Sequence, residues 1–271
     1  MSVVVTYSTS LGCELPLSET LAGLAELNAH SVDLLCIEGW AHQNPSKLAA
    51  EFPRSVAQLR AQFETHGLRI GSLNTMTGAP LHLRDQQNQE RRAQESTALL
   101  ELMSHFQIPS AALQPPLRRW SSWTDKEQDD AIVSTHEEVE RALLAGKRFA
   151  LELHSDSPFS TPAQIDRLLH AWPDVPLVFD PSHFIAQGLP LAATEPWMET
   201  AQLVHLRDAA PGHLQTPFGQ GTIDFDWLLG TLRDYGFDGV ISIEYLGFSN
   251  AGFAVKDSAR RLHDLVCEVF S

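Results

Sequence analysis

The chain has 271 residues, of which 43% are hydrophobic and 20% charged, with 34 acidic against 19 basic side chains and a formal net charge of −15. This composition is that of a globular protein with a sizeable core and excludes an intrinsically disordered chain. The acidic balance argues against a nucleic-acid partner, because binding to nucleic acid depends on Lys and Arg side chains that neutralise phosphates.

The sequence contains no sign of secretion or of a membrane partner. No apolar run approaches the roughly 20 residues of a membrane-spanning helix. The opening residues, Met-Ser-Val-Val-Val-Thr-Tyr, carry neither a basic segment nor an apolar stretch of signal-peptide length, so we expect a cytoplasmic protein. The three cysteines, Cys13, Cys36 and Cys267, form no Cys-x-x-Cys pair, which argues against a disulfide framework and a thiolate metal site.

Short apolar runs alternate with longer segments of helical periodicity along the chain. The runs are mostly continuous, which is typical of parallel strands buried on both faces. We predict strands at residues 3–7, 32–37, 68–73, 110–114, 149–154, 176–180, 203–207 and 240–245. We predict helices at residues 17–29, 45–66, 86–106, 126–145, 161–172, 195–200, 225–235 and 255–270.

Glycines and capping residues mark the ends of several predicted helices. Gly67, Gly146 and Gly236 each follow a helix at a position that favours a left-handed backbone, and Asp224 precedes one as an N-cap. Eight strand–helix units without an obvious linker predict an α/β fold, a single (β/α)8 TIM barrel domain over residues 1–271. The alternative, an open doubly wound sheet, usually requires a Gly-x-Gly-x-x-Gly loop after its first strand, and residues 8–12 contain none.

Acidic residues and a histidine lie at the C-terminal ends of the last four predicted strands, the catalytic face of TIM barrels. Alternation along each strand points these side chains at the barrel axis if their apolar neighbours face the helices. A single such residue is more often a helix cap or an ion-pair partner. Three carboxylates and one imidazole converging in one mouth, however, would repel one another and lose solvation unless a cation joined them. We therefore predict one divalent metal ion (Mn, Mg, Co, Zn or Fe) bound by Glu152, Asp180, His205 and Glu244.

Polar residues also end the second, third and fourth predicted strands. Glu38, Asn74 and Gln114 lie there, and each could hold a substrate hydroxyl or cap a loop. We predict Glu38 and Asn74 as substrate-binding residues.

Aromatic and basic residues near the mouth allow two interpretations each. Trp40, Trp120 and Phe248 could form an apolar wall over a sugar ring, or could pack elsewhere. Four arginines could contact an anion or be ordinary surface charges: Arg84, Arg91, Arg118 and Arg119. The chain has only four lysines, all on or beside predicted outer helices, which favours an unphosphorylated polyol or keto-sugar as substrate.

The second half of the chain resembles the xylose-isomerase-like superfamily, often labelled sugar phosphate isomerases/epimerases. The resemblance is strong over residues 149–245 and loose before them. It is carried by Leu-Glu-Leu-His (151–154), Phe-Asp-Pro-Ser-His (179–183), Val-His-Leu-Arg-Asp (204–208), Phe-Gly-Gln-Gly-Thr-Ile-Asp-Phe (218–225) and Gly-Val-Ile-Ser-Ile-Glu-Tyr (239–245). The resemblance implies one metal on the four residues named above, with His183 and Arg207 contacting a small-molecule sugar or polyol. Barrels of this kind often self-associate, so a homo-oligomer remains open.

The resemblance also implies an activity. In epimerases of this kind, one glutamate of the pair Glu152 and Glu244 removes a proton next to a carbonyl, and the other returns a proton on the opposite face. Xylose isomerase has a lysine where this chain has His154, and a histidine can act as an acid or a base near neutral pH. His154 is therefore a third catalytic candidate, and it opens an alternative, a dehydratase or lyase that eliminates water from a keto-sugar or keto-inositol.

Two further alternatives belong to other functional classes. The same superfamily includes apurinic-site endonucleases, DNA repair enzymes with additional histidines after the second and third strands, where this chain has Glu38-Gly39-Trp40 and Ser72-Leu73-Asn74. A non-catalytic sugar-binding barrel would retain the metal without turning over any keto-sugar.

Overall fold

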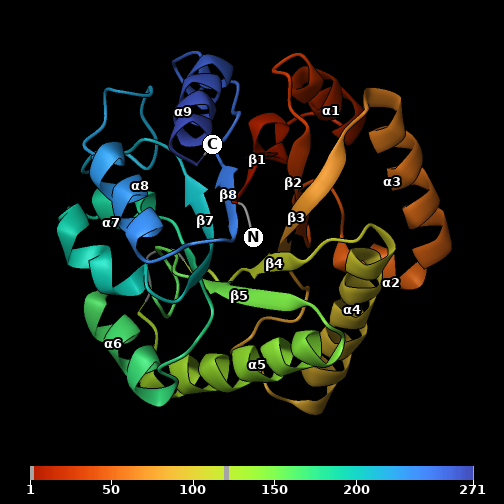
Figure 1. The fold of residues 1–271 in the computed structure, drawn as a ribbon. Coiled ribbons are helices and arrows are strands. Elements are labelled where there is room, and N and C mark those ends of the chain that lie inside the picture. The colour runs from red at the N-terminus through yellow and green to blue at the C-terminus, as the bar shows by residue number, and fades with distance from the viewer. Residues whose placement is uncertain (1–2, 119–121, 271) are drawn as a thin grey trace.

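The computed structural model describes residues 3–118 and 122–270, and its centre is a closed barrel of eight parallel strands (Figure 1). Each strand pairs with the next, and β8 pairs with β1 to close the barrel. The strands are β1 (Val4–Ser8), β2 (Ser31–Ile37), β3 (Arg69–Met76), β4 (Ser110–Leu113), β5 (Arg148–Glu152), β6 (Leu177–Phe179), β7 (Ala201–Leu206) and β8 (Val240–Ile243). The prediction of a single (β/α)8 TIM barrel is confirmed.

Helices surround the barrel as an outer ring, with α9 completing the ring between α8 and α1 (Figure 1). The α-helices are α1 (Leu17–Ala25), α2 (Pro45–Ala50), α3 (Phe52–His66), α4 (Gln86–His105), α5 (Asp125–Leu144), α6 (Pro162–Ala171), α7 (Ser182–Ala186), α8 (Phe225–Asp234) and α9 (Val255–Phe270). Two 3-10 helices, η1 (Thr9–Gly12) and η2 (Leu191–Trp197), lie in loops. The three glycines predicted to end helices have φ values of 64°, 68° and 72°, and the Asp224 side chain accepts a hydrogen bond from the Trp227 amide.

The helical segments differ from prediction in three places. The helix predicted over residues 45–66 is two helices, because Pro53 has no amide to donate and its ring would clash with the carbonyl four residues earlier in a continuous helix. The helix predicted over residues 195–200 is the 3-10 helix η2, which contains Pro196. The short helix α7 was not predicted; it follows Asp180, whose Oδ1 accepts a hydrogen bond from the Ser182 amide at 2.9 Å.

Alternating side chains divide the strands between the barrel interior and the helix layer. Ala112, Ala150, Val178, Leu203 and Val240 form one buried interior cluster. Their neighbours along the strands, such as Leu151, Phe179, Val204 and Ile241, belong to the main core shared with the helices. Because side chains repeat every second residue on one face, positions 152, 180 and 205 also point inward, two residues beyond the interior cluster. The apolar alternation therefore orients the predicted ligands.

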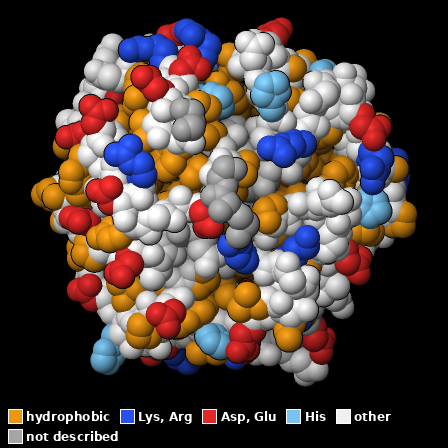
Figure 2. All heavy atoms as spheres, in the orientation of Figure 1, with side chains coloured by type: hydrophobic (Ala, Val, Ile, Leu, Met, Phe, Trp, Pro, Cys, Tyr) orange, Lys and Arg blue, Asp and Glu red, His pale blue; other side chains and the backbone are white. Residues whose placement is uncertain are grey.

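The chain is acidic overall, but its acidic side chains do not gather in one patch on the face that Figure 2 shows. Figure 2 shows Asp and Glu side chains spread around the rim, with Lys and Arg among them. No helix within the described ranges combines the length and the apolar character needed to cross a bilayer.

Candidate functional site

The four predicted metal ligands lie at the C-terminal ends of β5 to β8, and all are buried. Glu152 is the last residue of β5 and His205 lies within β7, whereas Asp180 and Glu244 each follow the last residue of a strand. These four strands thus end one or two residues earlier than predicted, but the side chains still enter one mouth.

Three of the four converge on a single point. His205 Nδ1 lies 3.3 Å from Glu152 Oε2 and 3.1 Å from Glu244 Oε2, and one ligand atom from each residue lies within 4.8 Å of the others. Neither ring nitrogen of His205 makes a hydrogen bond of acceptable geometry to a described residue. A buried imidazole whose nitrogen faces two carboxylates without a good hydrogen bond matches the donor set of a divalent cation, so the residues present fit a metal.

The environment of Asp180 differs from that of Glu152, His205 and Glu244. Its Oδ2 pairs with Arg207 Nη2 at 2.5 Å, and it does not belong to the compact group around His205. The Arg207 guanidinium also donates to Ser182 Oγ at 2.8 Å and to the Glu244 carbonyl at 3.0 Å. In this structure Arg207 therefore holds Asp180 and the chain after β8 in place. The roles of Asp180 as a metal ligand and of Arg207 as a substrate contact stay predictions.

His154 and His183 form a second group next to Glu152. Their ring centroids are 3.7 Å apart, and His183 Nε2 lies 3.7 Å from Glu152 Oε1, the oxygen not turned to His205. Ser155 Oγ lies 2.9 Å from His183 Nδ1, and Arg207 Nη2 lies 3.3 Å from Nε2. The three side chains Glu152, His154 and His183 could also hold a cation by distance. The Arg207 charge next to His183 opposes that, so we interpret the two histidines as groups that face a substrate.

Two amide side chains connect the glutamates. Asn74 Nδ2 donates to Glu244 Oε1 at 2.8 Å, and Gln114 Nε2 donates to Asn74 Oδ1 at 2.9 Å. Gln114 Nε2 also donates to Glu152 Oε2. Asn74 was predicted as a substrate contact; the structure shows it orienting a glutamate, and a substrate contact stays a prediction.

Glu38 lies at the rim and away from this cluster. Its carboxylate accepts hydrogen bonds from the amide and hydroxyl of Ser46 at 3.0 and 2.6 Å, at the start of α2, and Arg91 lies 3.4 Å away. The carboxylate thus serves the helix end and an ion pair, and its predicted substrate contact stays a prediction. Among the predicted aromatic wall residues, Trp40 and Phe248 are exposed, and Trp120 lies outside the described residues.

The electrostatics of the cluster favour a cation at its centre. Burial would lower the pKa of His205, but the Glu244 and Glu152 carboxylates raise it well above its ordinary value. Although burial would raise it, the pKa of Glu244 falls to about 2 because His205 and Arg207 are close. Burial, reinforced by the charges of His154 and Arg207, lowers the pKa of His183 well below its ordinary value. His183 is therefore a neutral hydrogen-bonding group at pH 7.

Two buried aspartates that sequence reasoning did not select shape the site. Asp208 Oδ2 accepts hydrogen bonds from the amides of Gly219 and Gly221 at 2.8 and 3.0 Å, which fixes the loop before α8. A Cβ on Gly221 would lie 1.9 Å from Asp208 Oδ1, so this position of the Gly-x-Gly motif requires glycine. Asp33 lies inside the barrel on β2, and its signal was a charged residue within the apolar run 32–37.

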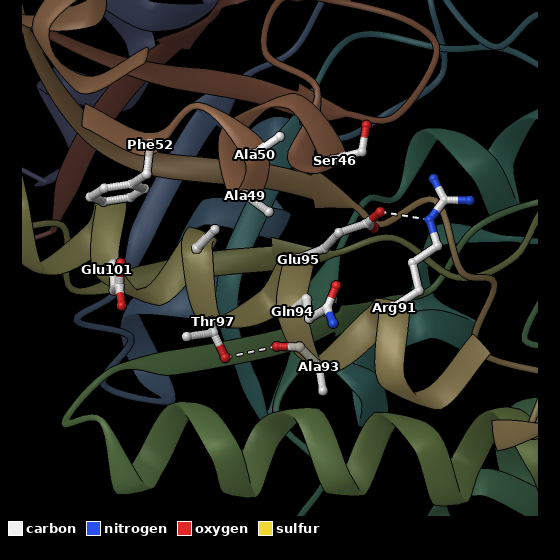
Figure 3. Close-up of a pocket in the computed structure, with 11 residues that line it drawn as sticks. Ser46, Ala49, Ala50, Phe52, Arg91, Ala93, Gln94, Glu95, Thr97 and Glu101 are labelled. Carbon is white, nitrogen blue, oxygen red and sulfur yellow. Dashed lines mark hydrogen bonds and ion pairs between the residues drawn. The ribbon is translucent and has the colours of Figure 1, made fainter. Parts of the chain in front are cut away.

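A surface hollow lies on the helix layer, away from the candidate site. It has a volume of about 700 Å³ and lies between α2 and α4, where Arg91 is paired with Glu95 at 2.7 Å (Figure 3). None of the four predicted metal ligands lines it. The convergence of ionisable groups, rather than the size of a hollow, locates the candidate site.

Comparison with known proteins identifies the family and the fold. A family model described as "Xylose isomerase-like TIM barrel" matches residues 21–265. No curated protein matches the chain. The fold is similar to the crystal structure of the IOLI protein with a zinc atom (19% identity, TM-score 0.73, all of both chains covered).

Two other solved structures with a similar fold are named as enzymes. The 3-keto-D-glucoside 4-epimerase YcjR from E. coli is 15% identical with a TM-score of 0.70, over 97% of this chain and 99% of that one. The probable 3-DHS dehydratase AsbF from Bacillus anthracis is 13% identical with a TM-score of 0.70, over 98% of this chain and 99% of that one. At these identities the likeness shows the fold.

Proposed function

Because the chain belongs to the xylose isomerase-like TIM barrel family, we propose that it is a metal-dependent isomerase or epimerase of a keto-sugar or related polyol. One observation carries the proposal: the carboxylates of Glu152 and Glu244 face the same nitrogen of His205 in the barrel mouth. The family resemblance and the name of the epimerase neighbour support the reaction class.

Glu152, His205 and Glu244 would hold the metal, with Asp180 as a fourth ligand if Arg207 releases it. Carboxylate and imidazole donors suit Mn, Mg, Co, Zn or Fe. When bound, such a cation stabilises the negative charge that develops on a substrate carbonyl oxygen as the neighbouring C–H bond breaks.

The residues of the chain supply the proton transfers. One glutamate oxygen accepts the proton from the carbon next to the carbonyl, and the other glutamate returns a proton to that carbon from the opposite face. Gln114 and Asn74 restrict the rotation of these carboxylates by donating to them. Neutral His183 supplies a hydrogen-bonding group on the Asp180 side, where Nε2 lies 3.5 Å from Asp180 Oδ2.

The charges around the mouth favour an unphosphorylated substrate. Arg84 and Arg118 are paired with Glu137 and Glu127 at 2.8 and 2.7 Å. Arg91 is paired with Glu95, and Arg119 lies outside the described residues. The three described arginines that could contact an anion are thus already neutralised by carboxylates.

The test is hydrogen exchange at the carbon next to the carbonyl. Wild-type protein loaded with Mn²⁺ is incubated with a panel of unphosphorylated ketoses in heavy water, and NMR follows the loss of that proton. We expect exchange with at least one ketose, and a loss of roughly 10²–10⁴-fold in Glu244→Gln. Glu140→Gln, on the exposed face of α5, is the matched control and should exchange like wild type. No exchange by the wild type with any ketose of the panel would contradict the proposal.

A dehydratase is the second candidate, and the proximity of His154 and His183 favours it. His154 lies next to Glu152 in the mouth, so it could protonate a departing hydroxyl. If it does, His154→Gln should retain proton exchange while product formation falls roughly 10²–10⁴-fold. His170→Gln, on the exposed face of α6, is the control. Unchanged exchange and product formation in His154→Gln would remove His154 from the mechanism and leave the epimerase.

A further inference from the structure

Asp33 is a buried carboxylate that the proposed reaction does not use. Its neighbours Val32 and Leu34 pack in the core shared with the helices, so Asp33 points into the barrel from β2, and none of its surface is exposed. Ser72 Oγ donates to Asp33 Oδ1 at 2.6 Å. The other oxygen, Oδ2, has no hydrogen-bond partner within residues 3–118 and 122–270. A buried carboxylate with a free oxygen is costly, so its retention calls for a partner.

The surroundings of Asp33 indicate where that partner lies. Burial raises the pKa of Asp33 to about 6, His205 opposes this increase, and the Glu244 and Glu152 carboxylates add to it. The strand register agrees with this closeness: Ser242, the partner of His205, pairs with Thr6 of β1, and Ser8, the next residue on the same face of β1, pairs with Asp33. Of these three neighbours, only His205 can donate a hydrogen bond to a carboxylate when the glutamates are ionised.

His205 has a free nitrogen on the side away from the glutamates. Its Nδ1 faces Glu152 and Glu244, and its Nε2 is buried without a hydrogen-bond partner in the described part of the chain. Ser242 pairs with His205 in the register of β7 and β8, and its Oγ is also buried and unpartnered among those residues. Asp33 Oδ2, His205 Nε2 and Ser242 Oγ are thus three buried polar atoms, the number that one buried water typically satisfies.

We infer that Asp33 is a positioning residue for His205: one ordered water accepts a hydrogen bond from His205 Nε2–H, donates one to Asp33 Oδ2 and is also bound by Ser242 Oγ. This bridge fixes the proton on Nε2, so that the Nδ1 lone pair faces the glutamates and the cation. Carboxylates that hold metal-binding histidines in this way typically raise metal affinity 10- to 100-fold. The inference rests on the metal site of the proposed function and adds a residue from a strand that supplies none of the predicted ligands.

The decisive variant is Asp33→Asn, which keeps the shape of the side chain and an oxygen for Ser72 but removes the charge. We expect the zinc Kd, measured by competition with a chelator of known affinity, to rise roughly 10- to 100-fold. Ser72→Ala is the matched control, because it removes the one direct hydrogen bond that the Asp33 side chain makes within the described residues and leaves the bridge intact; its Kd should change less than 3-fold. Thermal unfolding of metal-free Asp33→Asn should occur at the wild-type temperature or above it, since a buried charge has been removed.

A spectroscopic measurement separates positioning from a general structural effect. In zinc-loaded wild type, a side-chain ¹H–¹⁵N spectrum should show the His205 Nε2 proton as a slowly exchanging, downfield resonance. Asp33→Asn should shift it upfield and speed its exchange, and Ser72→Ala should not. A wild-type Kd in Asp33→Asn, or rapid exchange of the Nε2 proton in wild type, would overturn the inference while the metal site stands. Failure of the wild type to bind zinc would overturn the metal site and the inference together.

Discussion

Strands β5 to β8 carry ionisable side chains at or just after their C-terminal ends, whereas β3 and β4 carry amides near theirs that bond to two of those side chains. Glu152 and Glu244 face His205, and Asn74 and Gln114 donate to the two glutamates from across the mouth. The half with the acids supplies the groups that can bind a cation or move a proton. The half with the amides restricts the orientation of those groups. A residue near a strand end can therefore support a site by orienting another side chain, without touching the substrate.

The largest effect should come from the histidine at the centre of the ionisable half. His205→Ala removes the only nitrogen donor of the compact group and leaves two buried carboxylates facing each other. We expect zinc affinity to fall more than roughly 10²-fold, beyond the effect of losing a supporting residue. Zinc Kd and bound zinc after dialysis measure this. His170→Ala, at an exposed histidine on α6, is the control and should bind zinc as the wild type does. A His205→Ala protein that retains its zinc would contradict the role of His205 as a ligand.

Arg207 tests whether the ionisable half is also held together by charge. Arg207→Ala would leave Asp180 buried without its cation, and breaking such a pair costs about 3–5 kcal/mol. Denaturant unfolding of the metal-free protein measures the loss. The exposed Arg233→Ala serves as the control and should stay within about 0.5 kcal/mol of wild type. A change below 1 kcal/mol in Arg207→Ala would mean that the guanidinium is free to serve a substrate.

The amide half should show a smaller effect on turnover. Asn74→Ala removes the hydrogen bond to Glu244 Oε1, and hydrogen bonds to charged groups contribute about 1.5–3 kcal/mol. We expect kcat/KM for proton exchange to fall roughly 10- to 100-fold with metal content near wild type. Gln58→Ala, on the exposed face of α3, should not differ from wild type. Loss that appears only in KM would instead indicate that Asn74 contacts substrate.

The smallest effect is expected at Glu38. Its carboxylate is bonded to Ser46 and lies near Arg91, so Glu38→Gln should lower stability by at most about 1 kcal/mol and change kcat/KM less than 3-fold. Thermal unfolding and kinetics in one preparation measure both. A tenfold rise in KM with unchanged stability would restore Glu38 as a substrate contact and sharpen the boundary between the rim and the mouth.

The same contrast explains what the sequence could predict. The eight strands follow from short, mostly continuous apolar runs, which the sequence displays directly. The inward direction of the ionisable residues follows from the two-residue period of side chains along a strand. The pairing of Asp180 with Arg207, and of Asn74 with Glu244, joins residues on different strands, and no local pattern specifies which polar groups meet. Asp33 was missed because a single acid inside an apolar run does not reveal that it points into the barrel. The break between α2 and α3 could have been predicted from Pro53, which lies where a continuous helix cannot accept proline.

The central claim is that Glu152, His205 and Glu244 together hold one divalent cation in the barrel mouth. Anomalous X-ray diffraction from crystals of zinc-loaded protein tests it most directly. We expect one strong peak in the mouth, with His205 Nδ1 and an oxygen of each glutamate at about 2.0–2.2 Å. The same crystals will show whether Asp180 leaves Arg207 to join these ligands. A fully loaded crystal with no peak there, or with zinc bound only by residues outside this group, would contradict the account.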